Sequence, residues 1–264
     1  MSPSARYPAR RMFRQERLDA IVRRLQEEGC VTVAGLSEEL GVSAVTVRAD
    51  LAALQRAGRL ARTHGGAVPV PLGDGALSFS VRQAERMEAK ERIGAAAAEL
   101  VSDGEAIVLD SSTTAWQVAR HLLCRRDLTV LTTGLYVALE LLRAPGIAVF
   151  MPGGPVWREA AAFIGPWDGD LLREVNLGRG FFGGRGLTVA EGLTDPHRGE
   201  AELKRRLAAA VHEVNVIVDA SKVGKVSLAP CAALETIDRV ITDRDAPEDV
   251  VAALRERGIE VVLV

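Results

Sequence analysis

Two short segments of the sequence carry hydroxyl side chains in an arrangement that suits phosphate binding. Residues 110–114 read Asp-Ser-Ser-Thr-Thr, and residues 132–134 read Thr-Thr-Gly. Each segment follows an apolar run and precedes a helical pattern, so free backbone N–H groups and the helix dipole would favour an anion there. One such loop is more often a simple helix cap. Two such loops after successive apolar runs favour an anion site.

Two further features fall at the same kind of position. Gly153 and Gly154 follow a third apolar run, and Lys222 follows a fourth. The lysine could neutralise a phosphate or simply be solvated. Because ligands of open α/β sheets bind beyond the carboxyl ends of the strands, we expect these segments at one edge of a sheet.

Residues 195–202 are the stretch that best fits proton transfer. Asp195 and His197 stand close to Glu200 and Glu202, and isomerisation or deamination of a phosphosugar needs carboxylates or an imidazole. Acidic residues are also favoured in the first turn of a helix, where they need no chemistry. We therefore expect no catalytic residue. We expect no metal site either, because the four histidines are scattered without ligand spacing.

The elements that must position these residues are strands and helices in alternation. Short strands rich in Val and Ile, separated by helices, predict a mostly parallel sheet that is buried on both faces. A long helix is expected over residues 81–101. The expected strands span residues 106–109, 128–131, 147–150, 214–218, 240–241 and 260–263. The expected helices between them lie near residues 114–123, 135–143, 199–212 and 247–257.

Composition excludes several classes of protein. The chain has 264 residues, of which 48% are hydrophobic; this length suggests about two domains, and this apolar content excludes disorder. No run of about 20 uncharged apolar residues and no secretion signal is present, so we expect a cytoplasmic protein without a membrane span. Cys30, Cys124 and Cys231 lack paired spacing, and we interpret all three as buried thiols.

Charge is unevenly distributed along the chain. Residues 1–70 contain 11 Arg and 7 acidic residues, which gives them a net charge of +4, whereas the remaining 194 residues carry −6. A basic module on an acidic body is what we expect if only the first part meets a polyanion. Arg10, Arg11 and Arg14 could contact phosphates or form a solvated basic face.

The basic part of the chain shows a helix-turn-helix pattern. Apolar residues recur at helical spacing over residues 15–28, a second short helix is expected over residues 34–40, and Gly41 makes the turn. Ser43 can cap a third helix, whose small, hydroxyl and Arg side chains can enter a major groove. Residues 59–66 can form a hairpin wing; a unit that only contacts proteins is the alternative. The candidate DNA contacts are Ser43, Ala44, Val45, Thr46, Arg48, Ala49, Arg59, Arg62 and His64.

The third helix and the wing carry a specific resemblance. Residues 42–51, Val-Ser-Ala-Val-Thr-Val-Arg-Ala-Asp-Leu, and residues 62–67, Arg-Thr-His-Gly-Gly-Ala, resemble the DNA-binding domain of the DeoR family of bacterial transcription regulators. The resemblance extends to about Asp243 through segments similar to the effector domain of that family. This chain has Ala49 where the family usually has a second Arg, Ser112 where it commonly has Gly, and Thr132-Thr133-Gly134 where it commonly has Thr-Asn-Ser.

The resemblance implies an α/β protein: an N-terminal winged helix-turn-helix joined to a mostly parallel sensor domain that resembles the ribose-5-phosphate isomerase fold. The implied DNA-binding domain spans residues 14–69, with its helix-turn-helix at about 31–50. Because Pro and Gly crowd residues 69–75, we place a linker at 70–80 and the effector-sensing domain at 81–264. The implied effector contacts are Asp110, Ser111, Ser112, Thr113, Thr114, Thr132, Thr133, Gly134, Gly153, Gly154 and Lys222.

The function implied by the resemblance is regulation of transcription. We expect a repressor of a carbohydrate-metabolism operon whose binding to double-stranded operator DNA is controlled by a phosphorylated sugar or related metabolite. We expect no cofactor and no membrane partner, and we expect a homo-oligomer because helix-turn-helix proteins use symmetric sites. The alternative is an enzyme similar to phosphosugar isomerases or deaminases that carries an accessory DNA-binding module.

Overall fold

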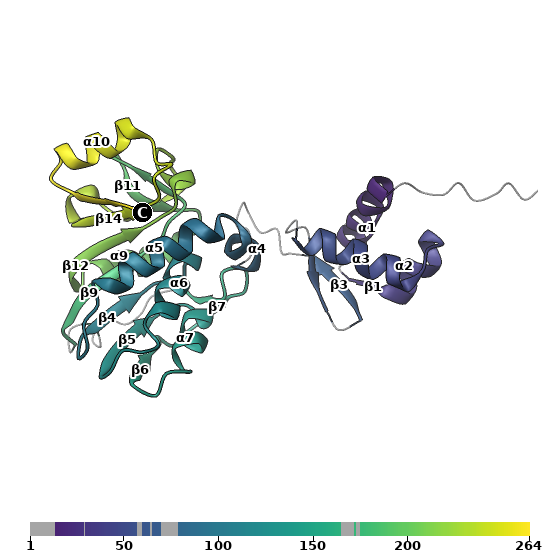
Figure 1. Cartoon of the computed structure of the whole chain (residues 1–264), viewed down its shortest axis with the longest axis horizontal. Coiled ribbons are helices and arrows are strands. Elements are labelled where there is room, and N and C mark those ends of the chain that lie inside the picture. The colour runs from purple at the N-terminus through teal and green to yellow at the C-terminus, as the bar shows by residue number, and fades with distance from the viewer. Residues whose placement is uncertain are drawn as a thin grey trace, which may run out of the picture. The chain divides into compact units, whose positions relative to one another are not determined.

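The computed structural model describes residues 14–28, 30–56, 60–63, 65–69, 79–164, 172 and 175–264. Contacts between residues divide the chain into two compact units, Met1–Leu72 and Gly73–Val264 (Figure 1). No helix within the described ranges combines the length and the apolar character that crossing a membrane requires.

The described part of the N-terminal unit contains three helices and a small antiparallel sheet. The helices are α1 (Arg14–Glu28), α2 (Val33–Leu40) and α3 (Ala44–Arg56). The strands are β1 (Val31–Thr32), β2 (Leu60–Arg62) and β3 (Gly66–Pro69), in the order β1-β3-β2. The apolar side of each helix faces one core, whose members include Ile21, Leu25, Leu36, Val47, Leu51 and Leu54. The helical spacing in the sequence therefore reflects burial.

Local hydrogen bonds set the ends of these helices. The hydroxyl of Thr32 accepts a hydrogen bond from the backbone N–H of Gly35 at 3.1 Å, which caps α2. Gly41 ends α2 in the left-handed conformation, with φ 63°. The hydroxyl of Ser43 then accepts a hydrogen bond from the backbone N–H of Thr46 at 3.2 Å. The cap predicted at Ser43 for the third helix is thus present.

The second unit is built on a sheet of seven parallel strands. They are β4 (Ala106–Leu109), β5 (Leu128–Thr132), β6 (Ile147–Phe150), β9 (Leu177–Phe182), β12 (Val211–Ile217), β14 (Arg239–Thr242) and β15 (Glu260–Leu263). Their order is β15-β14-β12-β9-β4-β5-β6, and every neighbouring pair is parallel. The prediction of a mostly parallel α/β sheet is confirmed.

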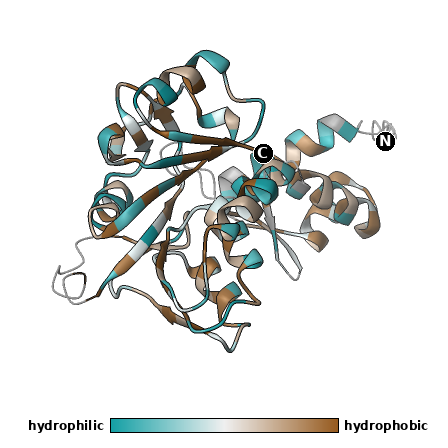
Figure 2. Cartoon of the chain, turned by 60° about the vertical axis from the view of Figure 1, so that its left-hand side comes forward, coloured by the Kyte–Doolittle hydropathy of each residue, from teal (hydrophilic) through white to brown (hydrophobic). Residues whose placement is uncertain are grey.

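Helices cover both faces of this sheet. They are α4 (Phe79–Ala84), α5 (Met87–Glu99), α6 (Thr113–His121), α7 (Leu135–Leu141), α9 (Arg198–Ala208) and α10 (Glu248–Glu256). Ile107 and Leu109 of β4 pack with α5, α6 and α7, whereas Val108 packs with α9 and α10 on the other face. Figure 2 shows the hydrophobic colour concentrated along the strands. Burial on both faces explains the continuous apolar runs.

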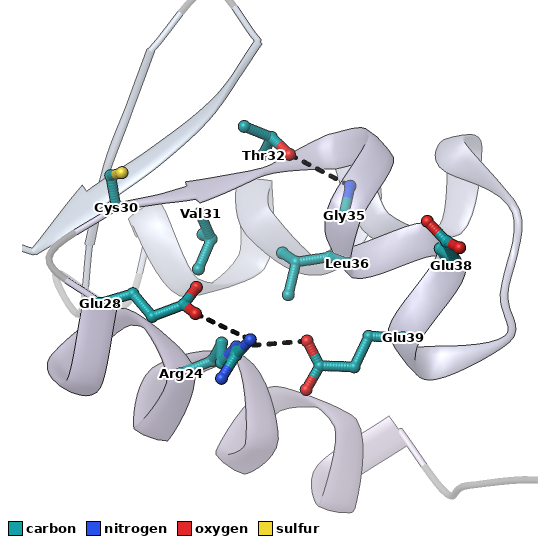
Figure 3. Close-up of a pocket in the computed structure, with 9 residues that line it drawn as sticks. All are labelled: Arg24, Glu28, Cys30, Val31, Thr32, Gly35, Leu36, Glu38 and Glu39. Atoms are coloured by element: carbon teal, nitrogen blue, oxygen red, sulfur yellow. Dashed lines mark hydrogen bonds and ion pairs between the residues drawn. The ribbon is translucent and has the colours of Figure 1, made fainter.

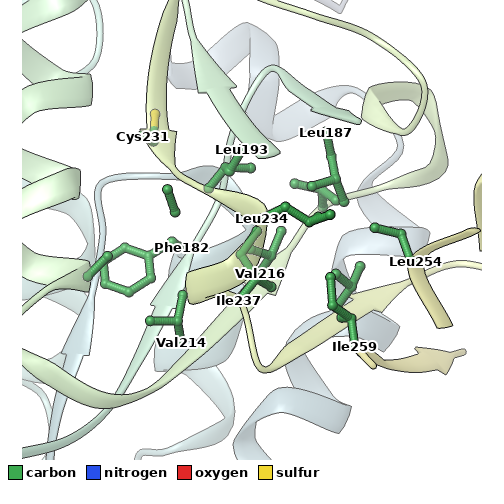
Figure 4. Close-up of a cluster of buried hydrophobic side chains, with 14 of the residues drawn as sticks. Phe182, Leu187, Leu193, Val214, Val216, Cys231, Leu234, Ile237, Leu254 and Ile259 are labelled. Atoms are coloured by element: carbon green, nitrogen blue, oxygen red, sulfur yellow. The ribbon is translucent and has the colours of Figure 1, made fainter. Parts of the chain in front are cut away.

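Smaller elements complete the second unit. A three-stranded antiparallel sheet contains β10 (Gly186–Thr188), β11 (Gly192–Asp195) and β13 (Ala229–Ala232). A hairpin pairs β7 (Val156–Trp157) with β8 (Ala162–Phe163), and two 3₁₀ turns are η1 (Ala220–Lys222) and η2 (Leu234–Thr236). Leu187 and Leu193 of the small sheet pack with Phe182 and Val216 of the large sheet (Figure 4).

One predicted helix is two helices. The expected helix at 81–101 is interrupted between α4 and α5, where Arg86 has φ 49°. This left-handed conformation is uncommon outside glycine. The guanidinium of Arg86 forms ion pairs with Asp243 at 2.7 Å and Asp245 at 2.8 Å, and these tertiary contacts hold the break open. The spacing of apolar residues in one segment could not predict this break, because it depends on contacts with residues far away in the sequence.

Three other predictions need correction. The strand β9 at the centre of the sheet was missed, because Gly178 and Gly180 weaken the strand pattern. The ring of Phe182 fills the space at Gly180, where an added Cβ would lie 2.4 Å from it. The helix expected over 199–212 ends at Ala208, and 211–212 belong to β12. Cys30 and Cys124 are exposed; only Cys231 of the three is buried.

Candidate functional site

Most of the residues predicted to contact DNA lie on α3. Val47, Leu51 and Leu54 are buried, whereas Val45 is 73% exposed and Arg48 and Ala49 are also exposed. Ala44 and Thr46 are partly exposed, and the hydroxyl of Thr46 lies 2.9 Å from that of Ser43. The predicted groove-facing side chains therefore share the exposed side of one helix, and Arg48 is the cation among them.

The wing is a hairpin held against the rest of the unit by a close backbone approach. Strands β2 and β3 are antiparallel, and β3 also pairs with β1. A Cβ at Gly66 would lie 1.9 Å from the carbonyl oxygen of Val31, so only glycine fits there. Arg62 is exposed at the end of β2. The predicted contacts Arg59 and His64 lie outside the described residues.

A groove on the same unit has the wrong charge for DNA. It lies between α1, β1 and α2, and Figure 3 shows Arg24 between two carboxylates that line it. Arg24 pairs with Glu28 at 2.7 Å and with Glu39 at 3.4 Å. Since Glu38 also lines the groove, phosphates would be repelled here. The exposed side of α3, by contrast, carries the cation Arg48.

Asp110 organises the loops at the carboxyl edge of the large sheet. It follows β4 and is fully buried. One carboxylate oxygen accepts a hydrogen bond from the backbone N–H of Ser112 at 2.9 Å, and the other accepts one from the N–H of Gly183 at 2.8 Å. Asp110 thus joins the loop after β4 to the loop after β9. Its role in the structure is to position these loops.

The loop after β4 leads into the N-terminus of α6. The hydroxyl of Ser112 caps this helix by accepting a hydrogen bond from the N–H of Ala115 at 3.0 Å. Ser112, Thr113 and Thr114 all line one pocket. Gly183 approaches so closely that an added Cβ would lie 2.5 Å from the Ser112 side chain. The predicted hydroxyl loop therefore opens onto a pocket at a helix N-terminus, which favours an anion.

The other predicted effector contacts lie beside or away from this pocket. Thr132 is buried, and its hydroxyl accepts a hydrogen bond from the N–H of Gly134 at 3.1 Å. A Cβ at Gly134 would lie 2.8 Å from the Cα of Ser111, so this loop supports the loop after β4. The residues that do not line the pocket are Asp110, Ser111, Thr132, Thr133, Gly134, Gly153 and Gly154. Lys222, in η1 after β12, does line it.

Side chains from distant segments line the same pocket, and the sequence analysis did not propose them for the effector site. Arg82 comes from α4, Lys90 from α5 and Arg185 from the loop between β9 and β10. Of the four cations Arg82, Lys90, Arg185 and Lys222, only Lys222 was a predicted effector contact, and no local pattern in the sequence connects them. The remaining lining residues are Gly183, Gly184, Asp195, Lys204, Ile217, Val218 and Asp219.

Burial lowers the pKa values of two lysines that line the pocket, Lys90 and Lys222. Lys90 is 4% exposed, and its ammonium group donates hydrogen bonds to the carbonyl oxygens of Arg82 and Glu85. Burial lowers the pKa of Lys90 to about 8. Burial also lowers the pKa of Lys222, and the positive charge of Arg185 acts in the same direction. An anion in the pocket would relieve both effects.

Lys204, which lines the pocket, forms a buried hub with the carboxylates around it. Its ammonium group lies 3.0 Å from Asp110 and 3.5 Å from Glu200, and it donates hydrogen bonds to Asp195 and to the carbonyl oxygen of Gly183. Burial alone would lower the pKa of Lys204, but these carboxylates raise it well above its usual value. Lys204 is therefore charged at neutral pH and is already occupied by carboxylates.

The acidic members of this hub differ in their pKa values. Burial raises the pKa of Asp195 to about 6, although Lys204 opposes the shift. The pKa of Glu200 is lowered, because Lys204 and Arg82 outweigh its burial. Glu200 also accepts a hydrogen bond from the hydroxyl of Ser111 at 2.6 Å. Burial raises the pKa of the neighbouring Cys231 thiol, so this cysteine stays protonated.

Comparison with known families matches both units. The DeoR-like helix-turn-helix domain matches residues 17–70, and the DeoR C terminal sensor domain matches residues 85–244. The HTH-type transcriptional regulator GolR of Listeria innocua is 36% identical over 250 residues, which cover 95% of this chain and 98% of GolR.

Two further relatives and one solved structure are similar. A putative aga operon transcriptional repressor of Escherichia coli O157:H7 is 33% identical, over 94% of this chain and 93% of the repressor. The transcriptional repressor GlcR of Bacillus subtilis is 31% identical, over 96% and 97%. Ribose 5-phosphate isomerase A from Methanocaldococcus jannaschii superposes with a TM-score of 0.41 at 19% identity, over 53% of this chain and 55% of the isomerase.

Proposed function

Because this chain belongs to the DeoR family of helix-turn-helix transcription regulators, we propose that it represses a carbohydrate-metabolism operon under the control of a phosphorylated sugar or related metabolite. Its helix-turn-helix domain binds DNA and its sensor domain binds a small-molecule effector. The names of the aga operon repressor and GlcR support the repressor role. We place this activity in the cytoplasm.

The observation that carries the effector proposal is the pocket at the N-terminus of α6. Thr113 and Thr114 offer hydroxyl groups and backbone N–H groups, and Arg82, Lys90 and Lys222 supply positive charge. Charge-assisted hydrogen bonds of this kind are the strong ones for phosphate. The predicted contacts that lie outside the pocket act in this proposal by holding the loop after β4 in place.

On the DNA side, we assign groove contact to the exposed side of α3. Arg48 and Val45 are exposed, and Thr46 is partly exposed, on the helix that follows the turn at Gly41. Arg62 on the wing contacts the sugar-phosphate backbone in this proposal. The positions at Ser43, Ala44 and Ala49 permit close approach because their side chains are small.

The helix α4 is suited to transmit the effector signal. It is the first described element after the interval that leads from the N-terminal unit. Its Arg82 lines the pocket, while its Phe79 stacks on Tyr136 of α7 with ring centroids 4.2 Å apart. An effector that binds Arg82 changes operator affinity only if it binds the two arrangements of α4 with different affinity.

We also propose that the protein acts as a homo-oligomer. One α3 helix reads one half-site, and symmetric operators need two. Exposed apolar side chains on α7 and on the edge strand β6 support self-association through this face; they are Tyr136, Leu139, Leu142 and Phe150. Replacement of Leu139 by Asp should then shift the molar mass in light scattering toward the monomer.

An enzymatic role is disfavoured by how the acidic stretch is used. Asp195 and Glu200 are both turned to Lys204, and Glu202 pairs with Arg205 and Arg206 on the surface. The ring of His197 stacks on Trp157 with centroids 4.2 Å apart. With these groups engaged in structural contacts, we propose that the sensor domain binds its ligand without turning it over.

A gel-shift titration on the DNA upstream of the gene tests this function. The protein is titrated at fixed salt, with and without a panel of phosphorylated sugars and their unphosphorylated counterparts. We expect specific binding that one phosphorylated sugar alters and its counterpart does not. Thr113→Ala should keep DNA binding and lose the response, whereas the exposed control Thr236→Ala should keep both. Turnover of a panel member without specific DNA binding would instead establish the enzyme.

A further inference from the structure

We propose that α4 is a lid on the effector pocket: it closes the pocket in this structure, and an anionic ligand binds only when α4 swings outward about Arg86. This inference rests on the proposed function, because it concerns access to the same pocket. Its basis is the small size of the pocket and the way in which α4 is attached to the sensor unit.

The pocket has too little space for the ligand that its lining is suited to bind. Its cavity measures about 20 Å³, which is room for one water molecule. Pockets that hold small molecules usually measure roughly 300 to 1,000 Å³. A groove elsewhere on the sensor unit, between α9 and β13, measures about 420 Å³. A sugar phosphate therefore needs at least one wall of this pocket to move.

Buried polar contacts fix several walls of the pocket. Asp110 holds the loop after β4 to the backbone N–H of Gly183 at 2.8 Å, and the buried Lys204 pairs with Asp110 at 3.0 Å. On the side of η1, the carboxylate of Asp243 accepts a hydrogen bond from the backbone N–H of Ala220 at 2.6 Å. These walls cannot move without leaving buried polar groups unpaired, which is costly.

The helix α4, in contrast, is weakly attached. Among the residues of α4 whose exposure is described, only Phe79 is buried, and it lies outside the two core clusters of the sensor unit. The next helix, α5, contributes Ile93, Ala97 and Ala98 to the core. Elements with few buried apolar contacts are those that open at low cost. Movement of α4 would therefore leave the core of the sensor unit intact.

Phe79 acts as the latch of this lid. Its ring stacks on Tyr136 of α7 with centroids 4.2 Å apart, and it meets the ring of Trp116 of α6 in a T-shaped contact at 6.4 Å. The guanidinium of Arg82 lies over the same ring, 5.9 Å from its centre. Arg82 lines the pocket, and its buried Nε atom has no hydrogen-bond partner among the described residues. The closed latch thus holds a cation with an unpaired donor against the pocket.

Arg86, between α4 and α5, has the properties of a hinge. Its φ of 49° lies in the left-handed region, which costs energy for a residue other than glycine. Its guanidinium holds this conformation through ion pairs with Asp243 at 2.7 Å and Asp245 at 2.8 Å. A change of backbone conformation at this residue would swing α4 while α5 stays in the core.

A bound anion would also weaken the closed state. The ammonium group of Lys90 donates hydrogen bonds to the carbonyl oxygens of Arg82 and Glu85, at the end of α4. Because Lys90 lines the pocket as well, an anion competes with these carbonyl groups for the same ammonium group. Hydrogen bonds to a charged acceptor are the stronger ones. Ligand binding and release of α4 are therefore coupled.

Hydrogen exchange measured by mass spectrometry on the full-length protein tests the lid. Sodium phosphate, and separately glucose 6-phosphate, is titrated against sodium chloride at equal ionic strength, and the peptides that cover α4 and α6 are compared. We expect the phosphate group to slow exchange at the N-terminus of α6, where it binds, and to speed exchange in α4, which it displaces. Slower exchange in both helices would show a wall that closes over its ligand and would overturn the lid.

The variant Phe79→Ala releases the latch and keeps all the cations of the pocket. We expect fast exchange in α4 without ligand. We also expect a phosphate affinity, taken from the midpoint of α6 protection, about three- to tenfold higher than in the wild type, because the closed state no longer competes with binding. Leu228→Ala removes an exposed apolar side chain outside the pocket and, as the control, should match the wild type.

The variant Arg86→Gly tests the hinge independently of the latch. Glycine permits the left-handed conformation and lacks the guanidinium, so α4 should again exchange faster and phosphate should bind more tightly. Asp127→Gly makes the same kind of backbone change at an exposed residue with φ 53° and should match the wild type. Circular dichroism checks that each variant keeps its fold.

The outcomes separate the lid from the function on which it rests. Protection of α6 without any change in α4 overturns the lid and leaves the anion pocket in place, as does a lower phosphate affinity in Phe79→Ala. If neither compound protects α6 in the wild type or in Phe79→Ala, the pocket does not bind phosphate groups, and the proposed effector function fails together with the lid.

Discussion

The two units of this protein differ in where their proposed anion-binding side chains come from and in how exposed these side chains are. The side chains that we propose to face DNA come from one helix and one hairpin and are largely exposed. The side chains that line the proposed effector pocket come from α4, α5, α6, the loop after β9 and η1, and several are buried. Residues of the exposed surface can therefore be replaced without loss of stability. Residues of the buried pocket also contribute to the packing of the core.

The buried charges of the two units show the same contrast. In the N-terminal unit, Asp50 accepts a hydrogen bond at 2.7 Å from Arg17, a residue whose side chain is partly exposed. In the sensor unit, Lys204 and its carboxylates are all buried. The exposed Arg14 also lies 3.7 Å from Asp50 and can replace a lost Arg17, whereas Asp110, Asp195 and Glu200 all depend on Lys204.

The largest effect should follow from Lys204→Met. This change leaves Asp110, Asp195 and Glu200 buried without their cation, so we expect the free energy of unfolding of the sensor unit to fall by about 3 to 5 kcal/mol. Chemical denaturation followed by circular dichroism measures the loss. The exposed Lys225→Met carries the same charge change outside the hub and should be nearly neutral.

The pH dependence of this variant sharpens the comparison. Burial raises the pKa of Asp195 to about 6 even with Lys204 present, and loss of this cation should raise it further, so the folded variant takes up a proton as the pH falls. The stability of the variant should therefore recover as the pH falls from 8 to 5. A loss that is independent of pH would show that Lys204 acts through packing, and a loss below 1 kcal/mol would contradict the buried hub.

A smaller effect, confined to DNA binding, should follow from Arg48→Ala. Arg48 is exposed on α3, so its removal should leave the melting temperature unchanged. Operator affinity should fall by about 1 to 3 kcal/mol if Arg48 contacts a base edge, and the salt dependence should flatten if it contacts a phosphate. Fluorescence anisotropy over a range of salt concentrations distinguishes the two.

The matched control for Arg48 lies in the other unit. Arg126→Ala removes an exposed arginine from the sensor domain and should leave the operator affinity unchanged at every salt concentration. If both variants weaken binding equally, net charge rather than α3 governs affinity. If Arg48→Ala also lowers the melting temperature by several degrees, the recognition surface is not separable from folding.

The same contrast explains what the sequence could predict. The helices of the N-terminal unit and the cap at Ser43 depend on residues within about one turn of each other, so local spacing was sufficient. Strand β9 and the break at Arg86 depend on distant partners. Gly180 makes room for Phe182, and Arg86 pairs with Asp243. Patterns within a single segment carry no information about such contacts.

Only part of the lining of the proposed effector pocket could be predicted from local sequence patterns. The hydroxyl loop at Ser112, Thr113 and Thr114 follows an apolar strand, and its position at a helix N-terminus could be inferred. The cations Arg82 and Arg185 reach the pocket from segments about a hundred residues apart. The strand order of the sheet, with β9 between β4 and β12, brings these side chains to the pocket. The sequence analysis could not predict this arrangement because it had missed β9.

The smallest predicted effect is a change with pH in the affinity for the effector, compared with the affinity for the operator. As the pH rises from 7 to 9, Lys90 loses its charge because its pKa is about 8, and Lys222, whose pKa is also lowered, acts in the same direction. Affinity for an anionic effector should therefore fall by about fivefold. Operator binding through Arg48 should change little, because arginine stays charged over this range.

The sign of the stability change separates this effect from alkaline unfolding. The pKa of Lys90 is about 8 in the folded protein against 10.5 for an unperturbed lysine, so the unfolded chain binds more protons between these values. Its contribution to stability therefore rises with pH over this window, while effector affinity falls. Lys90→Arg, which keeps its charge, should lose most of both trends in calorimetry and thermal unfolding. Parallel changes in stability and affinity would instead indicate that the pocket unfolds at alkaline pH.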